Sequence, residues 1–336
     1  MRIPRFSALP SRAAAVVLSA VLAAGCASST GTASESALTQ PELPDITVAA
    51  TPAADLAGLY IAQEEGLFAK QGLHVTLEKI ASNQAAVAAQ LKGQVDISAQ
   101  SYVSYIAAQA AGARFHILAE ASTLKPGTRV LVTRAGSRIT SIAGLAGKEI
   151  GVNGTNNIGT LLASALLAEY GISPKKADFI TDPKGYTDMP RQLQGGTWGA
   201  ALLAEPYATI AEEDYGDEEV ADTDQGATEN FPMDGYVATQ AWAKEYPKTG
   251  AAFVRAIQEG QAIADTSPLA VQSAIAKYDD LPIKVTAVMA IPGFPTGSVE
   301  APNIQRVANV MLEFGALSTR YSAEVESGAL IRSMIS

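Results

Sequence analysis

The stretch DITVAATPAADLAGLYIAQEEGLFAKQGLHVTL, residues 45–77, decides the fold class of this chain. Alternating apolar residues predict buried strands over 46–48 and 75–77. Between them, apolar residues at helical spacing over 56–63 predict a helix, and Gly66 is typical of the residue that ends one. A strand, a loop, a helix and a second strand in this order are the repeating unit of an α/β sheet.

The same alternation continues along the rest of the chain. It predicts further strands over 95–97, 115–120, 148–152 and 179–181, and helices over 84–91, 102–111, 160–170 and 186–193. After Gly235 the pattern is mostly helical, with Pro247 at a first helical position and an amphipathic helix from Val307 to Phe314. Strands that alternate with helices of this length favour parallel sheets covered on both faces.

A short internal similarity indicates two lobes. When Gly93 is registered on Gly196, Tyr102 falls opposite Glu205, and both are expected where a strand ends and a helix begins. Two similar lobes facing each other across a cleft explain this pattern most simply. We therefore expect a first lobe over 45–130, a second lobe over 131–230, and a return to the first lobe with C-terminal helices over 231–336.

The N-terminus is typical of an export signal. Three arginines and no acidic residue precede the apolar run Ala13–Ala24, and small residues follow it. The run has about 12 residues, whereas a membrane-spanning helix needs about 20. We therefore expect residues 1–25 to be a signal peptide that is removed from the mature protein.

Cys26 is the only cysteine, and it directly follows this signal. The run Leu22–Cys26 resembles a bacterial lipobox, in which the cysteine receives lipid, although Ala23 stands where a large aliphatic residue is usual. The alternative is ordinary signal cleavage with an incidental thiol. We expect a lipid on Cys26 and a flexible tether over 26–44, which places the protein on the extracytoplasmic face of the cell membrane.

The net charge of the chain limits the kinds of molecule that it is expected to bind. The whole chain has a formal net charge of −10, and residues 1–25 contribute three positive charges, so the mature part is at −13. An acidic chain without clustered Lys and Arg argues against nucleic acid and against adhesion to anionic lipid. The acidic stretch 212–224 lacks the ligand pattern of a calcium loop, so we interpret it as a solvated loop and expect no metal and no cofactor.

Several stretches together resemble a known family. They are Leu59–Leu73, Leu91–Asp96, Ile142–Asn157, Ala204–Tyr207 and Trp242–Ala256. In order and spacing they are similar to the solute-binding proteins of bacterial ABC importers for taurine, alkylsulfonates, nitrate and thiamine-pyrimidine precursors. The resemblance implies an α/β, two-lobed periplasmic-binding-protein-like fold of type II with a hinge between the lobes. It also implies a monomer that captures a small organic nutrient by hinge closure and delivers it to the permease and ATPase subunits.

Candidate ligand-binding residues of the second lobe lie at predicted carboxyl ends of strands, where ligands bind in open α/β sheets. Asn153, Thr155, Asn156 and Asn157 stand at a helix start, where unpaired N–H groups favour anions and carbonyl-type acceptors. Helix capping is the alternative for these residue types. The family often has Ser or His at 156–157 and Asp at Gly199, so these departures leave the ligand class open.

Further candidates come from both lobes. In the first lobe they are Gln100, Ser101 and Tyr102, and the alternatives are that Ser101 only caps the helix and Tyr102 only packs. Asp55 is either a helix cap or a cleft carboxylate. In the second lobe Tyr186 is a candidate for stacking on a flat ligand. Glu205 would repel a sulfonate but could accept hydrogen bonds from an amino-heterocycle or a cation; a salt bridge or a solvent-facing position is the alternative. An anionic ligand would need Arg129 or Lys184. We favour an aromatic or heterocyclic nutrient.

The sequence argues against an enzyme. His74 and His116 are the only histidines, no H-E-x-x-H or G-x-S-x-G motif occurs, and lipidation would use the only thiol. The family's eukaryotic relatives that make the thiamine pyrimidine carry a cysteine cluster, which is absent here. The alternatives to a transport protein are a membrane-tethered extracellular sensor and, with less support, an enzyme of the pyrimidine-synthesis type.

Overall fold

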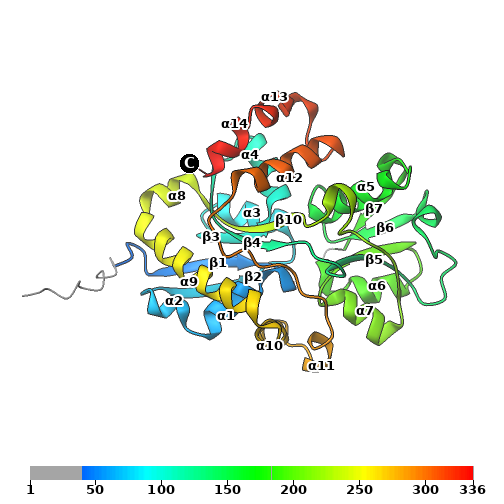
Figure 1. Ribbon diagram of the computed structural model, residues 1–336, viewed down its shortest axis with the longest axis horizontal. Coiled ribbons are helices and arrows are strands. Elements are labelled where there is room, and N and C mark those ends of the chain that lie inside the picture. The colour runs from blue at the N-terminus through cyan, green and yellow to red at the C-terminus, as the bar shows by residue number, and fades with distance from the viewer. Residues whose placement is uncertain (1–39, 183, 336) are drawn as a thin grey trace, which may run out of the picture. The chain divides into compact units, whose positions relative to one another are not determined.

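The structure is a computed structural model, and it describes residues 40–182 and 184–335. The predicted signal peptide 1–25, Cys26 and nearly all of the predicted tether lie outside the described residues. The described chain forms two five-stranded mixed sheets with helices packed against them (Figure 1). Among its helices, none is both long and apolar enough to cross a membrane.

The first sheet is built mostly from the start of the described chain. Its strands, in spatial order, are β2 (His74–Lys79), β1 (Asp45–Ala50), β3 (Ile97–Ser101), β10 (Pro232–Thr239) and β4 (Phe115–Thr123). β1 pairs in parallel with β2 and β3, whereas β10 runs antiparallel to β3 and β4. The connecting helices are α1 (Ala57–Glu64), α2 (Leu67–Lys70), α3 (Asn83–Leu91) and α4 (Tyr102–Ala110). The predicted unit over 45–77 is confirmed.

The second sheet repeats this arrangement. Its order is β7 (Asp178–Thr181), β6 (Glu149–Val152), β8 (Ala200–Ala204), β5 (Arg129–Thr133) and β9 (Glu218–Asp222), with α5 (Ile158–Glu169), α6 (Met189–Gln194) and α7 (Tyr207–Tyr215) as helices. β5 is antiparallel to both neighbours, as β10 is in the first sheet. β3 and β8 hold the same central place, so Tyr102 and Glu205 do follow equivalent strands, as the internal similarity predicted.

Two connections between the sheets lie side by side. The chain leaves the first sheet after β4 and returns to it at β10, so the second sheet is formed within residues 129–222. The Thr223 N–H donates to the Arg129 carbonyl at 3.1 Å, and the Gly127 N–H donates to Asp222 Oδ2 at 2.6 Å. The entry to the second sheet and the exit from it are therefore joined to each other.

The C-terminal third is helical, as predicted. It contains α8 (Gln240–Glu245), α9 (Pro247–Thr266), α10 (Pro268–Tyr278), α11 (Ile283–Thr286), α12 (Ala301–Glu313), α13 (Ser322–Glu326) and α14 (Ala329–Ile335). α9 begins at Pro247 and packs against α1 (Figure 1). A Cβ on Gly260 would collide with the Gly58 carbonyl oxygen, so glycine lets these two helices cross closely.

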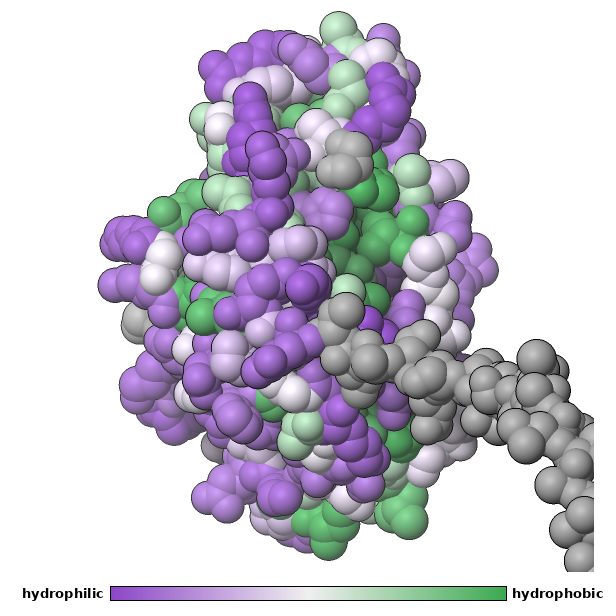
Figure 2. Space-filling view, turned by 90° about the vertical axis from the view of Figure 1, so that its left-hand side faces the viewer, coloured by the Kyte–Doolittle hydropathy of each residue, from purple (hydrophilic) through white to green (hydrophobic). Residues whose placement is uncertain are grey.

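Two large hydrophobic cores pack the helices against the sheets. Val48, Leu59 and Phe253 belong to a core between the first sheet and helices α1 and α9. A second core includes Ile106 of α4 and Leu162 of α5, so it joins residues that belong to both sheets and their helices. Hydrophilic residues dominate the face seen in Figure 2, with apolar residues in a few separate groups.

One segment differs from its prediction. The acidic stretch 212–224, interpreted as a solvated loop, forms the end of α7 and the whole of β9. β9 is the last strand of its sheet, and its first two residues, Glu218 and Glu219, are exposed. Charged side chains protect an edge strand from pairing with another chain, and they also hide the strand signal in the sequence.

Candidate functional site

The carboxyl ends of strands from both sheets meet in one place. The short helix η1 (Ala54–Leu56) follows β1, and the Ala54 N–H donates to the carbonyl of Glu205, just past β8, at 2.9 Å. The loop after β7 also reaches the first sheet, because a Cβ on Gly185 would be only 2.5 Å from the Ala81 carbonyl oxygen. Gly185 has φ +62°, a backbone conformation that glycine adopts without strain. The structure thus shows the two sheets in close contact at these ends.

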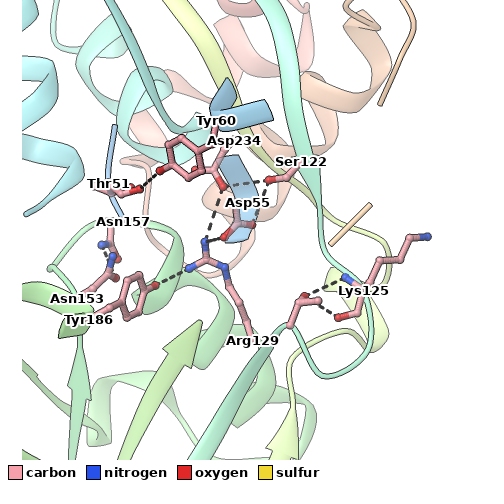
Figure 3. Close-up of polar contacts among 11 residues, drawn as sticks. Thr51, Asp55, Tyr60, Ser122, Lys125, Arg129, Asn153, Asn157, Tyr186 and Asp234 are labelled. Atoms are coloured by element: carbon pink, nitrogen blue, oxygen red, sulfur yellow. Dashed lines mark hydrogen bonds and ion pairs between the residues drawn. The ribbon is translucent and has the colours of Figure 1, made fainter. Parts of the chain in front are cut away.

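A buried polar cluster connects the two sheets at this place (Figure 3). Arg129, the first residue of β5, lies with Nη2 2.9 Å from Asp55 Oδ2 and 3.7 Å from Asp234 Oδ2. Its Nη1 donates to the Tyr186 hydroxyl. The Ser122 hydroxyl is 3.1 Å from Asp55 and 3.2 Å from Asp234. We call these five residues the Arg129 cluster; all are at most 6% exposed.

The cluster places one cation between two carboxylates. Burial by itself would lower the pKa of Arg129, but the charges of Asp55, Tyr186 and Asp234 raise it above its ordinary value. Burial, then the charge of Asp55, raises the pKa of Asp234, and Arg129 opposes this rise. Arg129 Nε has no hydrogen-bond partner among the described residues. The cluster is therefore a charged contact between the sheets whose hydrogen bonds are incomplete.

A cavity of about 180 Å³ lies beside the cluster and shares Tyr186 with it. Its lining residues follow β1, β2 and β7: Thr51, Pro52, Lys79, Ile80, Ala81, Lys184, Tyr186 and Thr187. Pockets for drug-sized ligands measure about 300–1,000 Å³, so this cavity fits a small solute. A larger hollow of about 390 Å³ includes Asp45 and His74, at the amino ends of β1 and β2. The smaller cavity is the better candidate because ligands of open α/β sheets bind at carboxyl ends.

The four predicted residues of the first lobe are buried, and none of them lines the cavity. Asp55 belongs to the Arg129 cluster. Ser101 accepts a hydrogen bond from the Val103 N–H at 3.2 Å and caps α4, which was the alternative for it. Gln100 and Tyr102 are fully buried, and neither the Gln100 amide nor the Tyr102 hydroxyl has a hydrogen-bond partner among the described residues.

The predicted loop before α5 caps the helix. Asn157 and Thr160 form a capping box, and the Asn157 amide donates to Asn153 Oδ1 at 2.8 Å. Thr155 and Asn156 are exposed. The Thr155 carbonyl accepts a hydrogen bond from Gln84 of α3, so this loop also contacts the first half of the chain. None of these residues lines the cavity beside the Arg129 cluster.

The Glu205 side chain forms hydrogen bonds within the protein and does not line the cavity. Its Oε2 accepts from the Thr209 N–H at 3.1 Å, and its Oε1 accepts from the Thr209 hydroxyl at 3.0 Å and the Ala290 N–H at 3.1 Å. Burial raises the pKa of Glu205 to about 7, and these hydrogen bonds oppose the rise. Both oxygens are occupied, so the structure gives no support to the expected contact between Glu205 and an amino-heterocycle.

Asp234 and Ser122 join the site without having been predicted. Asp234 interrupts an otherwise apolar run, Phe231–Val237, and a carboxylate inside such a run is a usable sequence signal. Ser122 gave no signal of its own. Among the residues that the structure describes, no group of three or more His, Cys, Asp or Glu side chains is arranged to hold a metal ion.

Comparisons with known proteins add a family and a fold. A model of the family described as NMT1/THI5 like matches residues 53–270, more than half of the chain. The chain is also similar to 4-amino-5-hydroxymethyl-2-methylpyrimidine phosphate synthase of Uromyces fabae, at 25% identity over 216 residues. That match covers 60% of this chain and 61% of the synthase, so the chain spans about three fifths of the length of the curated relative it matches.

Two solved structures have the same fold. The alkanesulfonate-binding protein SsuA from Xanthomonas axonopodis pv. citri, bound to MOPS, superposes with a TM-score of 0.69 at 14% identity, covering 84% of this chain and 96% of that one. The periplasmic nitrate-binding protein NrtA from Synechocystis PCC 6803 gives 0.71 at 16% identity, covering 88% and 89%. The predicted periplasmic-binding-protein-like fold is confirmed.

Proposed function

This chain belongs to the NMT1/THI5-like family, and we propose that it is an extracytoplasmic solute-binding lipoprotein of an ABC importer. It holds a small organic nutrient between its two sheets and delivers it to the permease. The observation that carries this proposal is the cavity at the carboxyl ends of β1, β2 and β7, which is lined from both sheets. A ligand there touches both halves at once, so it favours the closed arrangement over an open one.

Turnover has less support than binding. The similarity to a synthase gives the enzyme alternative one particular form, that of a pyrimidine phosphate synthase. The lining of the cavity, however, contains no His, Cys, Asp or Glu, which leaves Lys79, Lys184, Tyr186 and two threonines as the side chains that could act as acids, bases or nucleophiles. Tyr186 is hydrogen-bonded to Arg129, and burial raises its pKa to about 12, so it is a poor base at neutral pH. A tethered extracellular sensor would use the same binding step.

We expect a thermal-shift screen of the purified protein to identify the ligand class. The screen includes alkylsulfonates, nitrate, thiamine precursors, aromatic acids and small amines. A ligand of the folded protein raises the melting temperature in proportion to the logarithm of its concentration above its dissociation constant. Mass spectrometry of the recovered ligand checks that it is unchanged. If no small solute raises the melting temperature, or if a bound compound is converted, the proposal is wrong.

The lipid anchor is a separate part of the proposal and has its own test. In cells that express the full chain, we expect the protein to stay with the membrane fraction and to enter the detergent phase after Triton X-114 partitioning. The Cys26→Ser variant removes the only thiol, so we expect it in the aqueous fraction. A wild-type protein that partitions like the variant would mean that no lipid is attached.

A further inference from the structure

A further buried carboxylate, that of Asp279, lies close to the cavity and belongs to none of the groups of residues described so far. Asp279 directly follows α10, and its side chain is 1% exposed. Neither of its carboxylate oxygens has a hydrogen-bond partner among the described residues. It forms an ion pair with Lys79, whose Nζ is 4.0 Å from Oδ1. A buried carboxylate without hydrogen bonds destabilises a protein, so its presence calls for a role.

Tyrosine rings surround this carboxylate. Tyr278 stacks on Tyr60 of α1, with ring centroids 3.6 Å apart. Burial, followed by the charges of Asp279 and Tyr278, raises the pKa of Tyr207, the first residue of α7 in the second half of the chain. Figure 1 agrees with this, because α11, which packs against α10, lies beside α7. We call Tyr60, Tyr207, Tyr278 and Asp279 the tyrosine–aspartate cluster.

The cluster is connected to the cavity in two ways. The Tyr60 hydroxyl donates to the carbonyl of Thr51 at 3.1 Å, and Thr51 lines the cavity. Lys79 lines the cavity as well, and its Nζ lies 4.4 Å from the centre of the Tyr278 ring. The same ammonium group donates to the Tyr278 carbonyl.

The position of Lys79 indicates that the cluster attracts a cation. Its ammonium group lies over an aromatic face and next to a buried carboxylate, which is the arrangement that proteins use for organic cations. The Lys79 side chain is 49% exposed, and its flexible stem allows the charge to turn out into water. A ligand can then take its place.

We propose that the tyrosine–aspartate cluster binds the positively charged nitrogen of the ligand, an organic ammonium ion, and that this nitrogen replaces the ammonium group of Lys79. This inference rests on the proposed binding function and names its ligand class. Asp279 supplies charge and hydrogen-bond acceptors, the Tyr278 ring supplies its negative face, and the rest of the ligand lies in the cavity beside Pro52 and Ile80. The competing arrangement is an organic anion held by Lys79 and Lys184, which line the same cavity.

Two substitutions separate these arrangements because they are expected to act in opposite directions. The probes are choline and n-butylammonium as cations and methanesulfonate as the anion, all at constant ionic strength, with calorimetry and thermal shift as readouts. For a cation, Asp279→Asn removes a charge-assisted contact and should weaken binding about tenfold or more. Lys79→Met removes the internal competitor and should strengthen binding several-fold. If an anion binds at Lys79, Lys79→Met weakens binding instead.

Two exposed positions supply matched controls. Asp280→Asn makes the same chemical change as Asp279→Asn, one residue away, and Lys92→Met makes the same change as Lys79→Met at the C-terminal end of α3. Both variants should leave the affinity for choline within about twofold of wild type. Binding of methanesulfonate without binding of either cation overturns the inference but keeps the binding function. So does cation binding that Asp279→Asn leaves unchanged. If neither the cations nor the anion nor any solute of the wider screen binds, the binding function itself fails.

Discussion

The Arg129→Met variant is expected to lose about 3–5 kcal/mol of unfolding free energy at pH 8, since removal of one partner leaves buried charge uncompensated. In the native protein Arg129 lies between Asp55 and Asp234 at 2.9 and 3.7 Å, and its side chain is 4% exposed. Methionine retains much of the volume but none of the charge. Two neighbouring buried carboxylates of the first half would then lie at the contact between the sheets without their cation. Urea unfolding followed by circular dichroism measures the loss.

A combined variant is the control for the Arg129 cluster. In Asp55→Asn/Arg129→Met/Asp234→Asn the carboxylates are removed together with the cation, and replacement of a whole buried ion group is often nearly neutral. We expect this variant to recover most of the stability that Arg129→Met loses. A single Arg129→Met variant as stable as wild type would show that the cluster does not hold the sheets together, and would leave the closed arrangement without its main polar contact.

The unfolding free energy of the ligand-free protein is expected to fall by roughly 2–4 kcal/mol between pH 5 and pH 8. Burial raises the pKa of Asp279 and Glu205 to about 7, and it also raises the pKa of Asp234. A carboxyl group with a raised pKa binds more protons in the folded than in the unfolded state between its two pKa values. Stability from these groups is therefore complete below about pH 4 and is lost as pH rises through about 7.

Denaturant unfolding at pH 5, 6, 7 and 8 measures this dependence. The window avoids the acidic range in which carboxylates with a lowered pKa, such as Asp188 at about 2, gain protons and work in the opposite direction. Asp279→Asn has no proton to lose, so its profile should be flatter and its stability at pH 8 higher than wild type. A wild-type profile that is flat or rises from pH 5 to pH 8 would contradict the prediction.

The local pattern of the sequence predicted most of the fold. The strands and helices over 45–120 follow from alternating or helical apolar spacing and from glycines such as Gly66, which has φ +64°. β9 and β10 were not predicted, because their strand state depends on pairing with β5, β3 and β4, which are distant in the sequence. Long-range pairing overrides local propensity at such positions.

The site was predicted less well, and for a related reason. Asp55 was predicted as a helix cap or a cleft carboxylate and Tyr186 as a stacking residue, and both belong to the Arg129 cluster. The apolar run around Asp234 indicated only a buried carboxylate, and Asp279 gave no signal, since each meets its partners only after distant segments have packed together. A residue that directly follows a strand can contact a ligand or form a hydrogen bond within the protein, and the sequence does not distinguish the two. Glu205 was predicted to contact the ligand but forms internal hydrogen bonds instead.

The paired connections beside Arg129 and Asp222 bring together the two ends of the stretch between them, although this stretch shares a core with the rest of the chain. Its start and finish are hydrogen-bonded neighbours, so an equivalent piece from a relative could be spliced in at two adjacent points without lengthening either join. The part of the cavity wall formed by Lys184, Tyr186 and Thr187 would change in one step, while the larger part from β1 and β2 stayed as it was. Recombination within this family could thus create new ligand preferences faster than single substitutions can.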